Sequence, residues 1–510
     1  MKKFICFIGI ICLAIIIILN LIFTANLDSA EHIAINNNST IYVVGLILVG
    51  VLLFFATKAI NKHLYDDTDS KRKVRKFLFI GAFAIYIIFN IVWTIAVRPP
   101  IVGDQIHACN LAQTFYRGNL EEFLPNMTYA GIPLSEYMQS YHQQSSLAFV
   151  FSIFFRLIHF DEVAILRVLS VIGNIFIVIA LYKIVNQLSK KYKTNKVLLL
   201  TLILTFMSLP MLSTFIYGDI PSLALCLFSV YFMMKYTETK KILYPIFAAI
   251  FTMIAYMMRM NSLIFIIATV IYLLLNLFSG ITKKVWKENA LNILIIAMYI
   301  IVSIIPSSLV KNYYLDKYEM KKNKEYPTIS YFLMAMEESP RGNGWYNEAR
   351  GEYALKNGEN AKNEYVDEIK NRLKYFSENI GYTFDFYVKK LASMWTENTY
   401  AAVRNNTLEE NGPLEKMISP LTFYQKALLL VTSVCSLIVL IQNRKKLSLD
   451  VIFLITIFIG GFAFHILWEA KSRYIIPYIV ALIPIASICI NKIGIKEKCC
   501  QILHKNDIIT

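Results

Sequence analysis

Near its C-terminus the chain reads Leu449-Asp-Val-Ile-Phe-Leu-Ile-Thr-Ile-Phe-Ile-Gly-Gly-Phe-Ala-Phe-His-Ile-Leu-Trp468-Glu469-Ala-Lys-Ser-Arg473-Tyr474. The run 449–468 is apolar and about 20 residues long, which is the length a helix needs to cross roughly 30 Å of hydrocarbon. A second apolar run, 474–491, follows at once. Charge between two such runs indicates either a helix anchor or a binding site, because Arg binds phosphate in a planar, bidentate contact.

The same pattern recurs along the whole chain. Its 510 residues are 56% hydrophobic and only 17% charged, and the mean hydropathy is +0.51. A soluble chain of this length would expose too much apolar surface, so we predict an all-α polytopic membrane protein with about 12 transmembrane helices. The predicted spans are 4–24, 41–60, 77–97, 163–185, 197–216, 220–236, 243–258, 262–279, 291–310, 421–441, 449–468 and 474–491.

The net charge of +16 comes from Lys and Arg in short segments between these spans. This is the positive-inside pattern, so nucleic acid is excluded as a partner and both termini are expected in the cytoplasm. The short apolar stretch 145–160 is the one ambiguous element. If it crossed the membrane, the Lys-rich segment 183–196 would lie outside, so we predict a juxtamembrane helix on the outer surface.

The N-terminal run is too long for the core of a typical signal peptide and no A-x-A site follows, so we expect an uncleaved first span. Most of the eight cysteines fall in spans, and we expect no disulfide framework. The 311–420 domain is expected to be mixed in structure, with a charged helix at 359–378 and an interfacial helix at 380–397. The predicted divisions are two additional N-terminal helices (1–60), a core (61–310) with first outer loop 98–162, an extracytoplasmic domain (311–420), and C-terminal helices with a cytoplasmic tail (421–510).

This topology brings five ionisable residues to the outer face, and such groups near membrane depth are functional candidates. They are Asp104, Asp219, Arg259, Glu469 and Arg473.

Each of these residues also has a structural interpretation. Asp104 and Asp219 both stand where a helix begins, so either could be an N-cap instead of a catalytic carboxylate. Arg259 lies in a short turn and could simply extend toward the membrane surface. Glu469 and Arg473 are four residues apart, which would suit a local ion pair on a helix.

Four segments of the chain carry notable motifs: Gly103-Asp104-Gln105 followed by Ala112…Gly118, then Arg167-Val-Leu-Ser170, Tyr217-Gly-Asp-Ile-Pro221, and Glu469…Arg473-Tyr474…Pro477. In their order and common face, these motifs resemble the GT-C membrane glycosyltransferases. More narrowly, they resemble the bacterial relatives of protein O-mannosyltransferases and of aminoarabinose transferases acting on lipid A. Gln105 departs from the acidic pair found in many relatives.

The resemblance implies a polyprenyl-phosphate sugar as donor and transfer, with inversion, to an extracytoplasmic glycan, lipid or protein. Membrane lipids would be further partners of the protein. The resemblance also implies Asp104 as the base for the acceptor hydroxyl and Asp219 as the residue that orients the acceptor or a cation. It leaves a divalent metal ion open as a cofactor. Arg473, Arg259 and Tyr474 would bind the donor phosphate, and Glu469 and His107 would support the site.

Two other classes of protein remain as alternatives. A flippase or transporter of lipid-linked sugars would also need charges in a cavity, but transporters often carry inverted repeats, and none is visible in this sequence. A polysaccharide polymerase would also have a large outer loop. Loss of labelled sugar from a polyprenyl-phosphate donor would favour the transferase over both.

Overall fold

The computed structural model describes residues 1–64, 69–118, 128–129, 132–281, 286–321, 324–407 and 413–489. In these ranges the chain is mostly helical, and ten helices are long and apolar enough to cross a membrane. The predicted all-α polytopic class is therefore confirmed. These helices are α1 (Lys2–Ile22), α2 (Thr40–Leu64), α3 (Asp69–Ala96), α7 (Glu162–Leu188), the α8–η2 segment (Lys196–Thr214), α10 (Asp219–Thr239), α12 (Leu263–Ile281), α13 (Trp286–Lys317), α19 (Ile418–Asn443) and α20 (Leu449–Leu467).

The other two predicted spans are shorter helices, α11 (Leu243–Met258) and α21 (Ile476–Ala486). The span predicted at 197–216 is interrupted. Its first helix, α8, ends at Leu204, and the one-turn α9 (Ser208–Met211) and η2 (Leu212–Thr214) complete the segment. Pro210 lies in α9, just after this break, and cannot donate a helical hydrogen bond.

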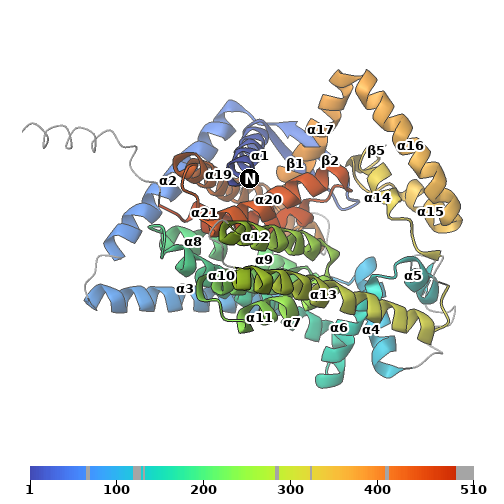
Figure 1. Ribbon diagram of the computed structural model, residues 1–510. Coiled ribbons are helices and arrows are strands. Elements are labelled where there is room, and N and C mark those ends of the chain that lie inside the picture. The colour runs from blue at the N-terminus through green and yellow to red at the C-terminus, as the bar shows by residue number, and fades with distance from the viewer. Residues whose placement is uncertain are drawn as a thin grey trace, which may run out of the picture.

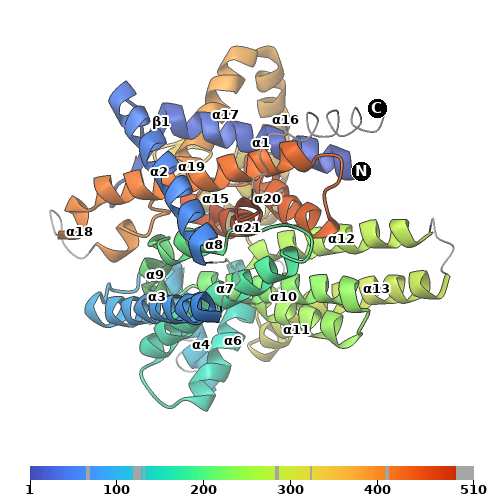
Figure 2. The same cartoon turned by 90° about the vertical axis from the view of Figure 1, so that its left-hand side faces the viewer.

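The helices form two layers, visible in both orientations of the ribbon (Figures 1 and 2). One layer contains α7, α10, α11 and α13, and the other contains α1, α19, α20 and α21. Helix α12 packs against both α13 and α20 and so joins the layers. A large apolar core runs through both layers.

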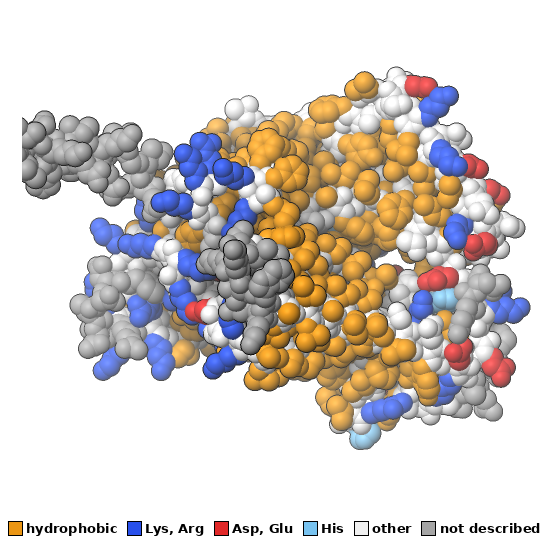
Figure 3. Space-filling model, viewed as in Figure 1, with side chains coloured by type: hydrophobic (Ala, Val, Ile, Leu, Met, Phe, Trp, Pro, Cys, Tyr) orange, Lys and Arg blue, Asp and Glu red, His pale blue; other side chains and the backbone are white. Residues whose placement is uncertain are grey.

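One end of the bundle collects the segments predicted to be cytoplasmic. Lys190 pairs with Glu238, and the Lys191 ammonium lies 2.7 Å from the Asp450 carboxylate. In Figure 3 Lys and Arg gather at the left-hand end, beside a broad belt of hydrophobic side chains. Loops that are predicted to lie on the same side of the membrane are therefore close together in the structure. The predicted cytoplasmic tail after residue 489 lies outside the described residues.

The opposite end carries the helices of the first outer loop. Helix α6 (Gln144–Leu157) packs beside α4 (Asp104–Arg117), and α5 (Leu134–Ser140) also contacts α4. Helix α6 coincides with the predicted juxtamembrane segment 145–160 and is too short to span a bilayer. The short strands β3 (Thr128–Tyr129) and β4 (Ile132–Pro133) precede α5.

A lobe made of residues 324–407, here called the polar lobe, stands beside this end at the upper right of Figure 1. Its helices α16 and α17 match the two helices predicted at 359–378 and 380–397. In the described part of the lobe, regular strand pairing is limited to β5 with β6, so it is less mixed than predicted. The elements are α14 (Ile329–Met334), β5 (Glu338–Ser339), β6 (Gly342–Asn343), α15 (Glu348–Asn357), α16 (Glu359–Glu378), α17 (Ile380–Trp395) and η5 (Arg404–Asn406).

A β-hairpin that the sequence did not predict joins α1 to α2. Strands β1 (Phe23–Leu27) and β2 (Ile33–Asn37) pair antiparallel and pack against α17 of the polar lobe. The Asn38 side chain donates to the carbonyls of Asn20, Leu21 and Phe23, at 3.0 to 3.2 Å. These are carbonyls that the end of α1 leaves without helical partners, so Asn38 fixes the entry to the hairpin.

Candidate active site

Asp104 is the first residue of α4, and its side chain accepts hydrogen bonds from two tyrosines. The Tyr137 hydroxyl lies 3.2 Å from one carboxylate oxygen and the Tyr217 hydroxyl 3.3 Å from the other. The N-cap is Gly103, with φ +58°, and no side-chain cap bond forms there. The N-cap interpretation of Asp104 is therefore wrong. The carboxylate remains exposed, so a hydroxyl group can approach it.

Tyr217 links Asp104 to the second carboxylate. Its hydroxyl also receives a hydrogen bond from Gln144 at the start of α6, and the Arg259 guanidinium stands 4.6 Å from its ring centroid. Gly218 permits this arrangement with φ +80°. A Cβ at Gly218 would lie 3.1 Å from the Leu147 side chain, so the turn has no room for a larger residue.

Asp219 follows at the start of α10 and faces Arg259, which lies between α11 and η3 (Met260–Ser262). The distance between Arg259 Nη2 and Asp219 Oδ1 is 3.2 Å. The N-cap position belongs to Gly218, so Asp219 is not the cap either. Burial opposes the charge on Arg259, but Asp219, Tyr217, Tyr474 and Asp104 together outweigh burial and raise the pKa of the guanidinium above its usual value. Arg259 is therefore an ion-pair partner rather than a surface anchor.

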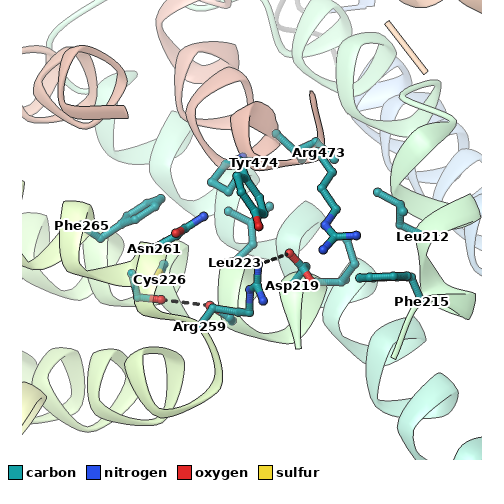
Figure 4. Close-up of a pocket in the computed structure, with 15 residues that line it drawn as sticks. Leu212, Phe215, Asp219, Leu223, Cys226, Arg259, Asn261, Phe265, Arg473 and Tyr474 are labelled. Carbon is teal, nitrogen blue, oxygen red and sulfur yellow. Dashed lines mark hydrogen bonds and ion pairs between the residues drawn. The ribbon is translucent and has the colours of Figure 1, made fainter. Parts of the chain in front are cut away.

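These residues line a small cavity, of about 30 Å³, between α10, η3, α12 and η6 (Ser472–Ile475). In Figure 4 the guanidinium groups of Arg259 and Arg473 stand on either side of Asp219. Tyr474 closes the same cavity, and most of the remaining lining is apolar. Its further lining residues include Leu212, Phe215, Ile220, Leu223, Phe265, Ile476 and Pro477. The cavity therefore combines cations with an apolar wall.

Arg473 is the one arginine of this cavity without an ion-pair partner in the described part of the chain. Its guanidinium carbon lies 4.3 Å from the Phe215 ring centroid, and its Nε, which is buried, has no hydrogen-bond partner. Glu469 instead accepts a hydrogen bond from the Tyr474 hydroxyl at 3.1 Å. The ion pair between Glu469 and Arg473 that their spacing suggested is absent, because residues 468–471 are not helical.

The supporting residues of the prediction lie around this cavity rather than in it. Burial raises the pKa of Glu469, which favours its neutral form. His107 stacks on Tyr137 with ring centroids 4.1 Å apart, and burial lowers its pKa. Among the described residues, no three His, Cys, Asp or Glu side chains converge as metal ligands.

The segment 468–473, here called the site loop, is held by the polar lobe. The Ala470 amide donates to the Gly344 carbonyl at 2.7 Å. The Lys390 ammonium, which is fully buried, donates to the carbonyls of Trp468, Ile466 and Ala335 at 2.8 to 2.9 Å. No local sequence pattern predicts these contacts or the roles of Tyr137 and Gln144. The motif 217–221 predicts a role for Asp219 but none for Tyr217.

Part of the chain is similar to a known protein family. Residues 146–305 match the family model described as dolichyl-phosphate-mannose-protein mannosyltransferase, a family of the GT-C superfamily. Over these residues the chain is similar to membrane glycosyltransferases of the GT-C superfamily. No curated protein matches it. The matched part of the chain runs from α6 into α13 and contains Tyr217, Asp219 and Arg259, whereas Asp104 and Arg473 lie outside it.

Proposed function

We propose that this protein is a glycosyltransferase that moves a sugar from a polyprenyl-phosphate donor to a hydroxyl group on an extracytoplasmic acceptor. The observation that carries the proposal is the convergence of Arg259, Arg473 and Tyr474 in one largely apolar cavity beside Asp104. A lipid-linked sugar phosphate needs both a cation and an apolar surface. The acceptor is a cell-surface glycan, a lipid or a protein.

The reaction would be a single displacement at the anomeric carbon. The acceptor oxygen attacks this carbon and forms the new glycosidic bond, while its proton passes to the Asp104 carboxylate. The bond between the anomeric carbon and the phosphate oxygen breaks, and its electron pair leaves with the polyprenyl phosphate. Since attack and departure occur on opposite faces of the sugar, the configuration inverts.

The cations would stabilise the departing phosphate. Arg473 has no ion-pair partner among the described residues, so its guanidinium is available for a charge-assisted contact with phosphate oxygens. Arg259 is already paired with Asp219, which fixes its position. Preorganised charge of this kind stabilises a transition state without reorganisation during the reaction.

The decisive experiment measures donor binding and sugar transfer in an Arg473→Lys variant. Lys keeps the charge and loses the bidentate geometry. Since hydrogen bonds to charged groups contribute about 1.5–3 kcal/mol, donor affinity should fall roughly 10- to 100-fold. Purified protein is incubated with radiolabelled polyprenyl-phosphate hexoses, beginning with mannose, and both lipid-bound label and bound donor are measured.

Two companion variants make the result specific. Arg117→Lys changes an exposed arginine paired with Glu162 and should leave donor affinity unchanged. Glu469→Gln, alone and combined with Arg473→Lys, tests the alternative in which Arg473 only pairs with Glu469, which requires the double variant to recover part of the loss. Unchanged donor affinity in Arg473→Lys would remove the phosphate role. Release of no label by the wild type with any of these donors would refute the function itself.

A further inference from the structure

The turn of the N-terminal hairpin carries Glu31, an acidic residue that reaches the site loop. Its side chain is only 9% exposed and binds three cations from two other parts of the chain. Arg404 Nη1 lies 2.7 Å from its carboxylate and Lys471 Nζ 3.7 Å away, and Arg341 also pairs with it. Two of these cations belong to the polar lobe, and Lys471 belongs to the site loop.

The backbone at Glu31 indicates that this placement is enforced by its surroundings. Its φ is +67°, in the left-handed region that residues with a side chain adopt at an energetic cost. The hairpin is also tied to the lobe by its main chain, since the Ile33 amide donates to the Arg341 carbonyl at 2.9 Å. The carboxylate is therefore presented to the cations by a fixed turn.

The cations around Glu31 determine its protonation state. Burial alone would raise the pKa of Glu31, but Lys471, Arg404, Arg341 and Arg473 together lower it to about 2. Glu31 is thus ionised at any physiological pH. Arg473 contributes to this lowering and so lies near the cluster, but no ion pair joins it to Glu31 in the described part of the chain.

We propose that Glu31 is a positioning residue for the donor phosphate: it fixes the site loop through Lys471 and leaves Arg473 as the cation open to the donor. The inference rests on the proposed function, in which Arg473 binds the phosphate. It also assigns a role to the two N-terminal helices, because the hairpin between them supplies this carboxylate. The N-terminal unit then completes the active site rather than standing beside it.

The test compares Glu31→Gln with the wild-type protein in donor binding, turnover and thermal stability. Pure electrostatics predicts tighter donor binding, because the variant loses a negative charge beside the phosphate site. If Glu31 instead positions the site loop, Glu31→Gln should bind the donor more weakly. A displacement of about 1 Å can cost on the order of 100-fold in rate, so we expect 10- to 100-fold weaker donor binding and a comparable loss of kcat/KM.

Three further variants separate positioning from simple structural support. Glu31→Asp keeps the charge and should recover part of the affinity. Lys471→Met should weaken donor binding as well, and combining it with Glu31→Gln should cost less than the sum of the two losses, because both act through one contact. Glu348→Gln removes another carboxylate from Arg341, one whose side chain is 70% exposed, and should stay within about twofold of wild type.

The results for these variants either support or overturn the positioning role of Glu31. Donor affinity in Glu31→Gln that equals or exceeds the wild-type value would overturn the inference, as would a change confined to thermal stability. If Glu31→Gln fails to fold, Lys471→Met decides, and unchanged affinity in that variant overturns the inference. If Arg473→Lys also binds donor normally, the phosphate role of Arg473 has failed and the role of Glu31 fails with it, whereas the proposed function itself is refuted only if the wild type releases no label. If Arg473→Lys alone weakens binding, only the role of Glu31 is lost.

Discussion

Asp104 receives hydrogen bonds from two tyrosine hydroxyls, which orient its carboxylate while leaving it exposed. Tyr137 comes from α5 and Tyr217 from the turn before α10, so elements from distant parts of the chain set the direction of one side chain. The sequence identified Asp104, but it could not predict these partners. Hydrogen bonds between distant segments depend on the packing of whole helices, and a local motif carries no record of them.

Replacing Asp104 with Asn tests its role as a base. Asn keeps the size of the side chain and can still accept a tyrosine hydrogen bond, but it cannot take a proton from an acceptor hydroxyl. Transfer should fall about 10²- to 10⁴-fold, as is typical when a positioned base is lost. Initial rates of sugar transfer measure the effect. The matched control is Asp161→Asn, since Asp161 is a true N-cap that accepts from the Ala164 amide at 2.6 Å. Equal rates for both variants would make Asp104 a structural residue.

At the scale of elements, the end of α20 is fixed by a lysine that the sequence placed on an interfacial helix. Lys390 of α17 donates to the Ile466 and Trp468 carbonyls, which the end of α20 leaves without helical partners. Hydropathy predicted the position of α20 well, because a run of apolar residues is a local signal. It predicted nothing about Lys390, whose three acceptors lie on two other segments. The role of Glu31 likewise depends on distant cations, and the one local signal is an acidic residue in a short segment without Lys or Arg.

The buried Lys390 predicts a pH dependence of stability. Burial lowers its pKa to about 7, although Glu469 opposes this effect. The ordinary value is 10.5, so between about pH 7 and 10.5 the unfolded chain binds more protons, and stability rises with pH in this window. Below about pH 7 Lys390 is protonated in both the folded and the unfolded chain, so it makes no contribution to the pH dependence of stability.

The variant Lys390→Met should remove this rise, which melting temperatures between pH 7 and 10 in detergent would show. Lys389→Met is the matched control, because Lys389 is exposed and pairs with Asp385. Its profile should keep the wild-type slope. Parallel profiles for wild type and Lys390→Met would contradict the assignment.

At the scale of the whole molecule, the segments rich in Lys meet at one end and the candidate site lies at the other. Composition and hydropathy predicted the class and the order of the helices, because membrane insertion imposes strong local constraints on sequence. They could not predict the interruption after α8, the hairpin at residues 23–37, or the attachment of the polar lobe to the site loop. Each of these depends on contacts between segments far apart in the chain.

The predicted orientation places the 183–196 segment in the cytoplasm and the polar lobe outside. In a variant without native cysteines, Lys193→Cys should react with an impermeant maleimide only after the cells are permeabilised. Asn379→Cys, between α16 and α17, should react in intact cells and serves as the accessible control. Strong labelling at position 193 from outside would reverse the topology and place the site on the cytoplasmic face.

The shortness of α11 has a consequence for the thickness of the bilayer around the protein. Its 16 residues extend only about 24 Å, less than the roughly 30 Å of a bilayer core, and Arg259 follows its last turn directly. If its far end sits at the opposite surface, Arg259 lies several ångströms below the plane of the headgroups. The bilayer would then thin around the site to relieve the hydrophobic mismatch. Activity should consequently depend on acyl-chain length in reconstituted membranes, with short-chain lipids favouring the enzyme.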